Sequence, residues 1–282
     1  MTAAVFIPHL GLSNLGAERW LKLGPFSFQP VEILKFGFVL YFAAWLSWVK
    51  NKVKDFKFGI LPLIIMLAII AVILFKQPDT KSFILITATG ISMLFVSSVP
   101  LKYILGIGLG SVLLLGGLVY FTPYLQERVK TFINPAQDAQ GSSYQIQQSL
   151  IALGSGGIFG RGFGQSVQKF SYLPEPQGDS IFAVLGEELG FIGALATIFL
   201  YILFLLRGFR IANRAPDLFS GLLVFGIVIL ITMQSFMHIA SVTGVFPLTG
   251  VPLVFMSQGG TSLMVYLIAI GIVLNISKFQ KN

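Results

Sequence analysis

The sequence predicts an all-α polytopic membrane protein, and two features of its 282 residues carry that prediction. Hydrophobic residues make up 55% of the chain and charged residues only 11%, whereas a soluble domain usually carries about 25% charge. Seven stretches are also long and apolar enough for a helix to cross a bilayer, which takes about 17 to 25 residues. Strands of a membrane barrel would be about 9 to 11 residues long and would alternate in polarity, so the spans are predicted to be helices.

The predicted spans define one membrane domain over residues 1–282. They cover residues 31–49, 59–75, 82–99, 103–121, 180–206, 218–237 and 260–276. Two connections between them are long, a loop at 122–179 and another at 238–259.

The loop cations predict the orientation of the spans. On an alternating path, ten of them fall on one side: Lys50, Lys52, Lys54, Lys57, Lys102, Arg207, Arg210, Arg214, Lys278 and Lys281. Because short cytoplasmic loops are rich in Lys and Arg, the C-terminus is predicted to be cytoplasmic, and the N-terminus and both long loops extracytoplasmic. Residues 1–30 have no signal-peptide pattern. Either a short tail is translocated without one, or an odd number of helices precedes this chain.

Composition excludes several classes of function. The chain has no Cys, which excludes disulfides and thiolate chemistry. Its two histidines, His9 and His238, have no partner at metal-ligand spacing. The net charge of +8 comes from cations between apolar spans, which favours anionic lipid or a lipid-linked substrate over nucleic acid. No motif implies a soluble cofactor, and a divalent cation bridging a pyrophosphate remains open.

The loop at 122–179 is long enough to be functional. Within Ser143–Leu153, Ile146, Leu150 and Leu153 share one helical face, which predicts an interfacial helix on the membrane surface. Six glycines follow within residues 154–164. Such a segment can form an anion-binding nest of backbone N–H groups, and a flexible turn with tight helix packing is an equal alternative.

The loop at 238–259 is apolar but interrupted by Gly and Pro. Irregular backbone at membrane depth must be satisfied by protein or by water. The pattern therefore predicts a re-entrant segment that lines a cavity.

Five blocks of sequence together resemble the SEDS family of lipid-linked peptidoglycan polymerases (shape, elongation, division and sporulation proteins; FtsW/RodA/SpoVE). They are Gly16–Trp20 with Phe28–Glu32 and Lys35, Gln77–Asp79, Arg128–Pro135, Tyr144–Gly193 and Thr243–Leu263. The longest block favours the division member over the elongation member. The resemblance covers the later seven of the family's ten helices, so the first three are expected to be absent.

The resemblance implies an inverting peptidoglycan glycosyltransferase that polymerises lipid II at the outer face of the bacterial cytoplasmic membrane. It also implies a class B penicillin-binding protein as partner, with other proteins of the divisome or elongasome. Two other functions stay open. A lipid II flippase would need charges along a path through the helices, and a truncated, non-catalytic division scaffold would need no catalytic acid.

Asp179 is the expected general base. It stands at the outer end of the fifth span, where a sugar on a lipid anchor would lie, and the resemblance places the family's essential Asp there. Help from a general base is worth about 10²–10⁴-fold in rate. The alternative is an ordinary helix N-cap, a common place for Asp.

Other polar residues receive supporting roles. Those expected to contact the pyrophosphate or a sugar are Arg19, Lys35, Arg128, Arg161, Lys169 and Glu175. Glu187 and Glu188 follow Asp179 by eight and nine residues, roughly 12–14 Å deeper along a regular helix. They are expected to pair with a buried cation, for which Lys35 is one candidate, or to relay a proton. Glu32 and Lys35 are spaced to pair with each other on one helix.

Overall fold

The computed structural model describes residues 2, 11–14, 17–23, 26–134 and 142–280. It contains two compact units, and each is described by itself. Unit 1 comprises Met1–Ser111, Leu205–Ile231 and Gly260–Asn282, and unit 2 comprises Val112–Phe204 and Thr232–Gly259. Three long helices supply residues to both units: α4 (Leu101–Phe121), α8 (Ile181–Asn213) and α9 (Leu218–Val242).

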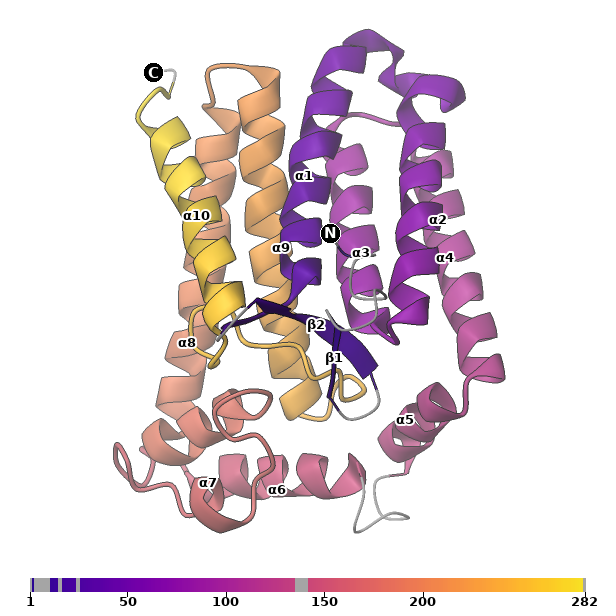
Figure 1. The fold of residues 1–282 in the computed structure, drawn as a ribbon. Coiled ribbons are helices and arrows are strands. Elements are labelled where there is room, and N and C mark those ends of the chain that lie inside the picture. Colours follow the sequence, from indigo (N-terminus) through magenta and orange to yellow (C-terminus); the bar gives the residue numbers. More distant parts are fainter. Residues whose placement is uncertain (1, 3–10, 15–16, 24–25, 135–141, 281–282) are drawn as a thin grey trace. The chain divides into compact units, whose positions relative to one another are not determined.

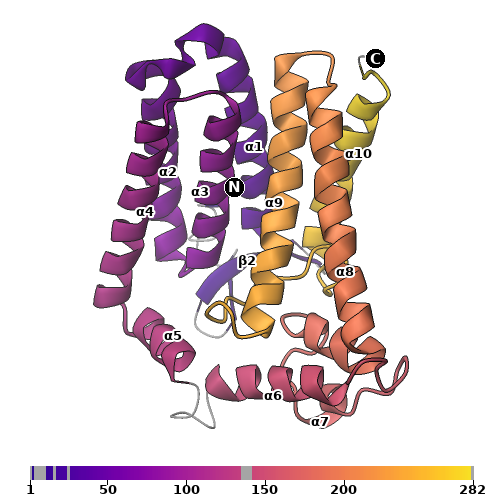
Figure 2. The ribbon, with the colours of Figure 1, turned by 180° about the vertical axis from the view of Figure 1, so that it is seen from behind.

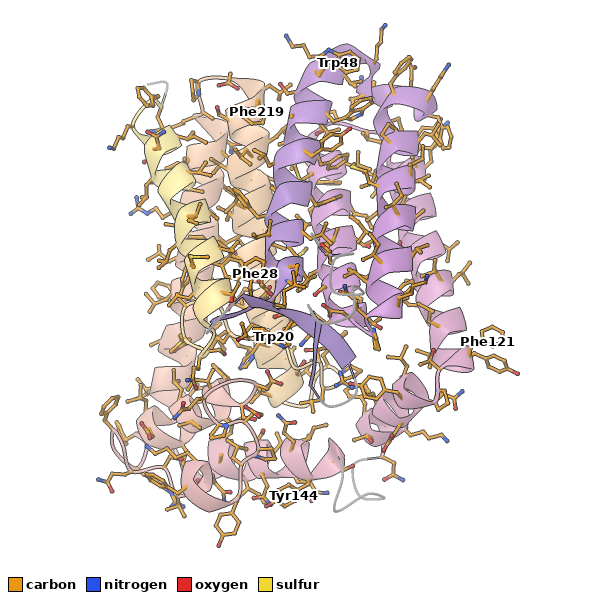
Figure 3. The ribbon with its side chains drawn as sticks, in the orientation of Figure 1. Trp20, Phe28, Trp48, Phe121, Tyr144 and Phe219 are labelled. Carbon is orange, nitrogen blue, oxygen red and sulfur yellow. The ribbon has the colours of Figure 1, made fainter. Side chains whose placement is uncertain are left out.

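Unit 1 is built mainly from apolar helices. Its complete helices are α1 (Pro30–Val49), α2 (Leu61–Lys76), α3 (Thr80–Val96) and α10 (Gly260–Ser277), and α1, α2 and α3 stand side by side in Figure 1. A 3-10 turn (Lys50–Lys54) and a π-helical turn (Phe56–Ile60) join α1 to α2. The indole of Trp45 donates to the carbonyl of Phe58 at 2.9 Å, which fastens this connection. Trp48, on the same helix, projects away from it and is 70% exposed (Figure 3).

Two glycines bring the helices of unit 1 close together. A Cβ on Gly90 of α3 would lie 3.0 Å from both Leu63 and Phe38, and one on Gly226 of α9 would lie 2.5 Å from Val39. Small residues at such points let helix backbones approach closely, which is how helices associate in lipid.

A small sheet precedes α1 and was not predicted. Its strands β1 (Gly11–Asn14), β2 (Ala17–Leu23) and β3 (Phe26–Phe28) pair antiparallel in the order β1-β2-β3. The β1–β2 register shifts between Leu12 and Ser13, and Leu21 pairs with Phe28 across β2 and β3. The sequence of β2, AERWLKL, does not alternate strictly between apolar and polar residues, and β1 and β3 have only four and three residues, so no period-two pattern reveals the sheet.

The helices confirm the predicted multi-pass membrane protein. Within the described part of the chain, six helices are long and apolar enough to cross a bilayer: Pro30–Val49, Phe56–Lys76, Leu101–Phe121, Ile181–Asn213, Leu218–Val242 and Gly260–Ser277. The seventh predicted span is α3, a shorter apolar helix of 17 residues. The helix of the fifth predicted span continues past the apolar run that ends at residue 206, because α8 extends through Arg207 and Arg210 to Asn213. A cation at a membrane boundary ends the apolar run without ending the helix.

Unit 2 contains a small apolar core. It contains α5 (Pro123–Ile133), α6 (Ser142–Ser155) and α7 (Gln168–Ser171), which Figure 2 shows between α4 and α8. The core residues are Ala152, Leu173, Phe182, Ala183, Val184, Tyr201, Ile239, Val242 and Leu253. They come from α6, the turn between α7 and α8, α8, α9 and the loop that follows α9. The predicted helix at Ser143–Leu153 is confirmed as α6, whereas α5 was not predicted.

The segment predicted to be re-entrant is irregular, but it begins later than expected. Residues 238–242 belong to α9, and residues 243–259 contain no helix. The Ser241 hydroxyl donates to the carbonyl of Pro247 at 3.1 Å, and the Tyr201 hydroxyl donates to the carbonyl of Val254. Side chains of α8 and α9 thus satisfy part of this irregular backbone, as a position at membrane depth would require.

Candidate active site

Asp179 lies on a tight turn between α7 and α8. The amides of Gly178 and Ser180 both donate to the carbonyl of Glu175, at 3.1 and 3.2 Å. Glu175 itself has a φ of 46°, a conformation that costs a non-glycine residue energy and that clusters at functional sites. The turn is therefore held in a strained and well-defined shape.

Neighbouring elements fix this turn from both sides. Gln145 of α6 donates to the hydroxyl of Ser180 at 3.1 Å, and that hydroxyl donates to the carbonyl of Pro174 at 2.9 Å. From the loop after α9, the Ser257 hydroxyl donates to the carbonyl of Gly178 at 2.7 Å. The amide of Gln258 donates to the carbonyl of Gln177 at 2.8 Å. These contacts with Gln145 and the 257–258 segment were not predicted.

The Asp179 carboxylate is half-buried and has no hydrogen-bond partner among the described residues. It is not the N-cap of α8, because the carbonyl of Ser180 accepts the first helical bonds, from Ala183 and Val184, and that marks Ser180 as the cap position. The carboxylate interacts electrostatically with His238. His238 is buried, and its Nδ1 lies 2.7 Å from the carbonyl of Val251. The Asp179 oxygens are thus left for a ligand.

The glycine-rich loop after α6 binds the two buried glutamates. Glu187 accepts hydrogen bonds from the Ser166 hydroxyl at 2.5 Å and from the amides of Val167 and Gln168 at 3.1 and 3.3 Å. Glu188 accepts from the amide of Gly164 at 2.9 Å and pairs with Lys169 at 2.6 Å. The N–H groups of this loop therefore hold the protein's own carboxylates.

This arrangement bears on two alternatives that the sequence left open. The anion at the glycine-rich loop is Glu187 with Glu188, so the tight-packing alternative describes the segment better than a free nest does. Arg161 and Lys169 are the cation partners of these glutamates within unit 2, and Lys35, a candidate partner from the sequence, pairs with Glu32 within unit 1. Backbone N–H groups, and not only cations, can stabilise a buried carboxylate by donating hydrogen bonds to it.

The glycine-rich loop makes backbone hydrogen bonds to α8 at a break in this helix. Gly190 has a non-helical φ of 69°, which frees the backbone groups on either side of it. The loop satisfies them. The amides of Arg161 and Gly162 donate to the carbonyls of Glu187 and Glu188, both at 3.0 Å. In return the amides of Phe191 and Ile192 donate to the carbonyls of Gly157 and Ile158, at 2.9 and 3.2 Å.

Loss of the Glu187 carboxylate is expected to destabilise unit 2. Glu187→Ala would leave Ser166 and two buried amides without an acceptor, at about 1–3 kcal/mol for each group that water does not reach. We expect a loss of about 3 kcal/mol, measured as a lower midpoint of thermal unfolding in detergent. Arg161→Gln is the control, because the 3.6 Å pair with Glu187 involves a side chain that is 42% exposed and such pairs contribute about 0–1 kcal/mol. Equal losses from both substitutions would contradict this assignment.

Unit 1 holds a separate buried polar cluster. The Lys35 ammonium lies 2.9 Å from the Glu32 carboxylate and 3.0 Å from the Tyr266 hydroxyl. Lys35 and Glu32 are 2% and 4% exposed. The pairing that their spacing predicts is present, whereas the contribution of Tyr266 from α10 could not be read from local spacing.

Substituting Lys35 alone is expected to lower the stability of unit 1 more than substituting Glu32 and Lys35 together. Lys35→Met leaves a buried, uncompensated carboxylate, which typically costs about 3–5 kcal/mol. The double variant Glu32→Gln with Lys35→Met should recover most of that loss, as a higher unfolding midpoint in detergent. A double variant no more stable than the single one would show that the charge of Glu32 is not the source of the loss.

The remaining predicted site residues have different surroundings. Arg128 on α5 donates to the carbonyl of Leu248 at 2.7 Å and lies over the ring of Tyr124, so it supports the loop after α9. Glu175 is exposed, with its carboxylate beside Gly178. Arg19 lies on β2, but its side chain is outside the described ones. Among the described residues, no three His, Asp or Glu side chains form a group that could hold a metal ion.

Known proteins match this chain along nearly its whole length. The sequence model of the FtsW/RodA/SpoVE family, described as "Cell cycle protein", matches residues 1–282. Stage V sporulation protein E of Bacillus subtilis is 40% identical over 98% of this chain and 76% of its own length. A probable peptidoglycan glycosyltransferase FtsW of Geobacter sulfurreducens is 41% identical over 97% of this chain and 73% of its own length.

Solved structures of the same family have a similar fold. One chain, from a peptidoglycan synthase complex described as coordinating polymerization and crosslinking, has a TM-score of 0.80 at 26% identity, covering all of this chain and 78% of that one. The rod shape determining protein RodA of Thermus thermophilus has a TM-score of 0.69 at 25% identity, covering all of this chain and 75% of RodA. The chain therefore belongs to the FtsW/RodA/SpoVE family.

Proposed function

We propose that this protein polymerises lipid II by inverting glycosyl transfer, with Asp179 as the general base. The activity class, a peptidoglycan glycosyltransferase, follows from the family. The observation that supports the base is the Asp179 carboxylate itself, which is half-buried, held on a rigid turn and without a hydrogen-bond partner among the described residues. A carboxylate kept in place but unsatisfied is ready to accept a hydroxyl proton from a substrate.

In this mechanism the carboxylate takes the proton of the acceptor sugar's 4-hydroxyl. The oxygen then attacks the donor's anomeric carbon as the bond to the lipid pyrophosphate breaks, which inverts the configuration at that carbon. Positive charge stabilises the leaving pyrophosphate. Arg161 suits this role because its side chain is 42% exposed and its contact with Glu187 is long.

We assign the other predicted contacts on weaker grounds. Arg128 and Lys169 already bind the Leu248 carbonyl and Glu188, and Lys35 is buried with Glu32. Each would have to exchange or share a partner to reach a pyrophosphate. Glu175 is exposed beside the Asp179 turn and would contact a sugar, and Arg19 keeps its role through the resemblance alone.

We also propose a class B penicillin-binding protein as the partner, which would crosslink the strands that this protein makes. Support comes from the similar chain in a complex that couples polymerization with crosslinking. The proposed location is the bacterial cytoplasmic membrane, with the Asp179 turn outside and the C-terminus inside. The Lys and Arg distribution supports this orientation.

The test is polymerisation of purified lipid II by the chain in proteoliposomes, together with its candidate transpeptidase. We expect glycan strands that a muramidase degrades, with the configuration at the anomeric carbon inverted in the product. Transfer of labelled lipid II across the bilayer without strand formation would contradict the proposal and support a flippase.

A further inference from the structure

The loop between α6 and α8 carries an apolar surface that the proposed chemistry does not use. Five of its large apolar side chains are strongly exposed: Ile158 at 62%, Phe159 at 81%, Phe163 at 89%, Val167 at 50% and Phe170 at 76%. Exposed apolar side chains scattered singly are normal, but a group of this size marks an interaction surface. We call these five side chains the loop patch.

The loop patch is joined to an exposed apolar face of a helix that is able to cross a membrane. The backbones of Gly157 and Ile158 accept hydrogen bonds from Phe191 and Ile192 of α8. Phe191 and Ile192 are 63% and 51% exposed, and the apolar exposure continues along the helix. Because α8 is long and apolar enough to cross a membrane, its exposed apolar side chains suit contact with acyl chains. The loop patch extends that surface sideways from the break at Gly190.

The polar groups of the loop do not oppose contact with lipid. Insertion of irregular backbone is expensive when N–H and C=O groups lose water without gaining a partner. Here several amides of the loop already bind Glu187 and Glu188, through their backbone carbonyls and their side chains. Moving this loop to a partly dehydrated position therefore costs less free energy than its glycine content suggests.

The cations of the loop fit the same environment. The Lys169 ammonium lies 5.0 Å from the centre of the Phe170 ring, and the Arg161 side chain is 42% exposed. Aromatic side chains with adjacent Lys and Arg are typical of segments at the boundary between headgroups and acyl chains, where the cations reach anionic phosphates.

We propose that the loop patch is inserted into the interfacial region of the bilayer, as a lateral membrane anchor next to the break in α8. The occupant is bilayer lipid itself and not the acyl tail of a substrate or a partner protein, because the patch continues the lipid-facing side of α8. Such an anchor would fix the level of the Gly190 break in the membrane.

The absence of native Cys allows a direct test. Single cysteines at Phe159, Phe163 and Phe170 would each carry an environment-sensitive fluorophore, in proteoliposomes without lipid II or partner protein. Quenching is measured with lipids that bear a nitroxide near the top of the acyl chain and with aqueous iodide. Leu195→Cys, on the exposed apolar face of α8, is the lipid-facing control, and the exposed polar Gln177→Cys is the water-facing control.

Strong lipid quenching at the three patch positions, comparable to that at Leu195, with weak iodide quenching is the expected result. Phe163→Ser with Phe170→Ser should raise iodide quenching of the label at Phe159, because the patch would then insert less. Three results would overturn the proposal: iodide quenching as strong as at Gln177, protection from both quenchers, or protection that appears only after polyprenyl-linked substrate or partner protein is added. None of these readouts depends on catalytic activity.

Discussion

Asp179→Asn is expected to lower the rate of lipid II polymerisation by about 10²–10⁴-fold, the usual contribution of a general base, while leaving the protein folded. The amide has nearly the shape of the carboxylate but cannot take the hydroxyl proton. Stability should change little, because the carboxylate accepts no hydrogen bond from the described residues and is not the cap of α8. The measurements are single-turnover glycan formation and the thermal unfolding midpoint in detergent.

Glu127→Gln is the matched control for this substitution. It makes the same chemical change at an exposed position of α5 and should leave both rate and unfolding midpoint unchanged. Ser257→Ala probes the support of the turn, since it removes the hydrogen bond to the carbonyl of Gly178, and it should slow the reaction less than Asp179→Asn does. Full activity of Asp179→Asn would remove Asp179 as the base, and would favour a scaffold if division also continued normally.

The sequence was sufficient for the spans because their signal is local. Each predicted span is visible as a long and mostly apolar run, and the differences lie at the ends, as at α8, where the helix continues past the run. The Glu32–Lys35 pair was also predictable, because i,i+3 spacing on a helix fixes which side chains meet.

The site was predicted less completely because its contacts join distant segments. Asp179 could be proposed from its place before an apolar span together with the resemblance. Its support by Ser257 and Gln145 depends on tertiary packing that no local pattern encodes. For Glu187 and Glu188 we expected cations or a proton relay. A signal was nevertheless present, in that a glycine-rich segment rich in unused N–H groups precedes two buried carboxylates in the same chain.

Gly160→Ala is expected to be the most destabilising single-methyl change in unit 2. Gly160 has a φ of 81°, and a Cβ there would lie 2.1 Å from the carbonyl oxygen of Glu188 and 2.6 Å from the amide nitrogen of Gly190. These atoms are backbone and cannot rotate away. To relieve this clash, the loop would have to move away from the break in α8. That movement would break the four hydrogen bonds that the loop makes there.

The expected loss is about 5 kcal/mol or more, because left-handed backbone costs about 1–2 kcal/mol and each buried group left unsatisfied costs about 1–3 kcal/mol. Gly164→Ala isolates the first contribution, since Gly164 has the same φ of 81° but open space around its Cβ position. The two unfolding midpoints in detergent should therefore differ widely. If both substitutions lower the midpoint by the same amount, the left-handed backbone conformation alone explains why glycine is needed at these positions. The hydrogen bonds between the loop and α8 would then not be the reason for Gly160.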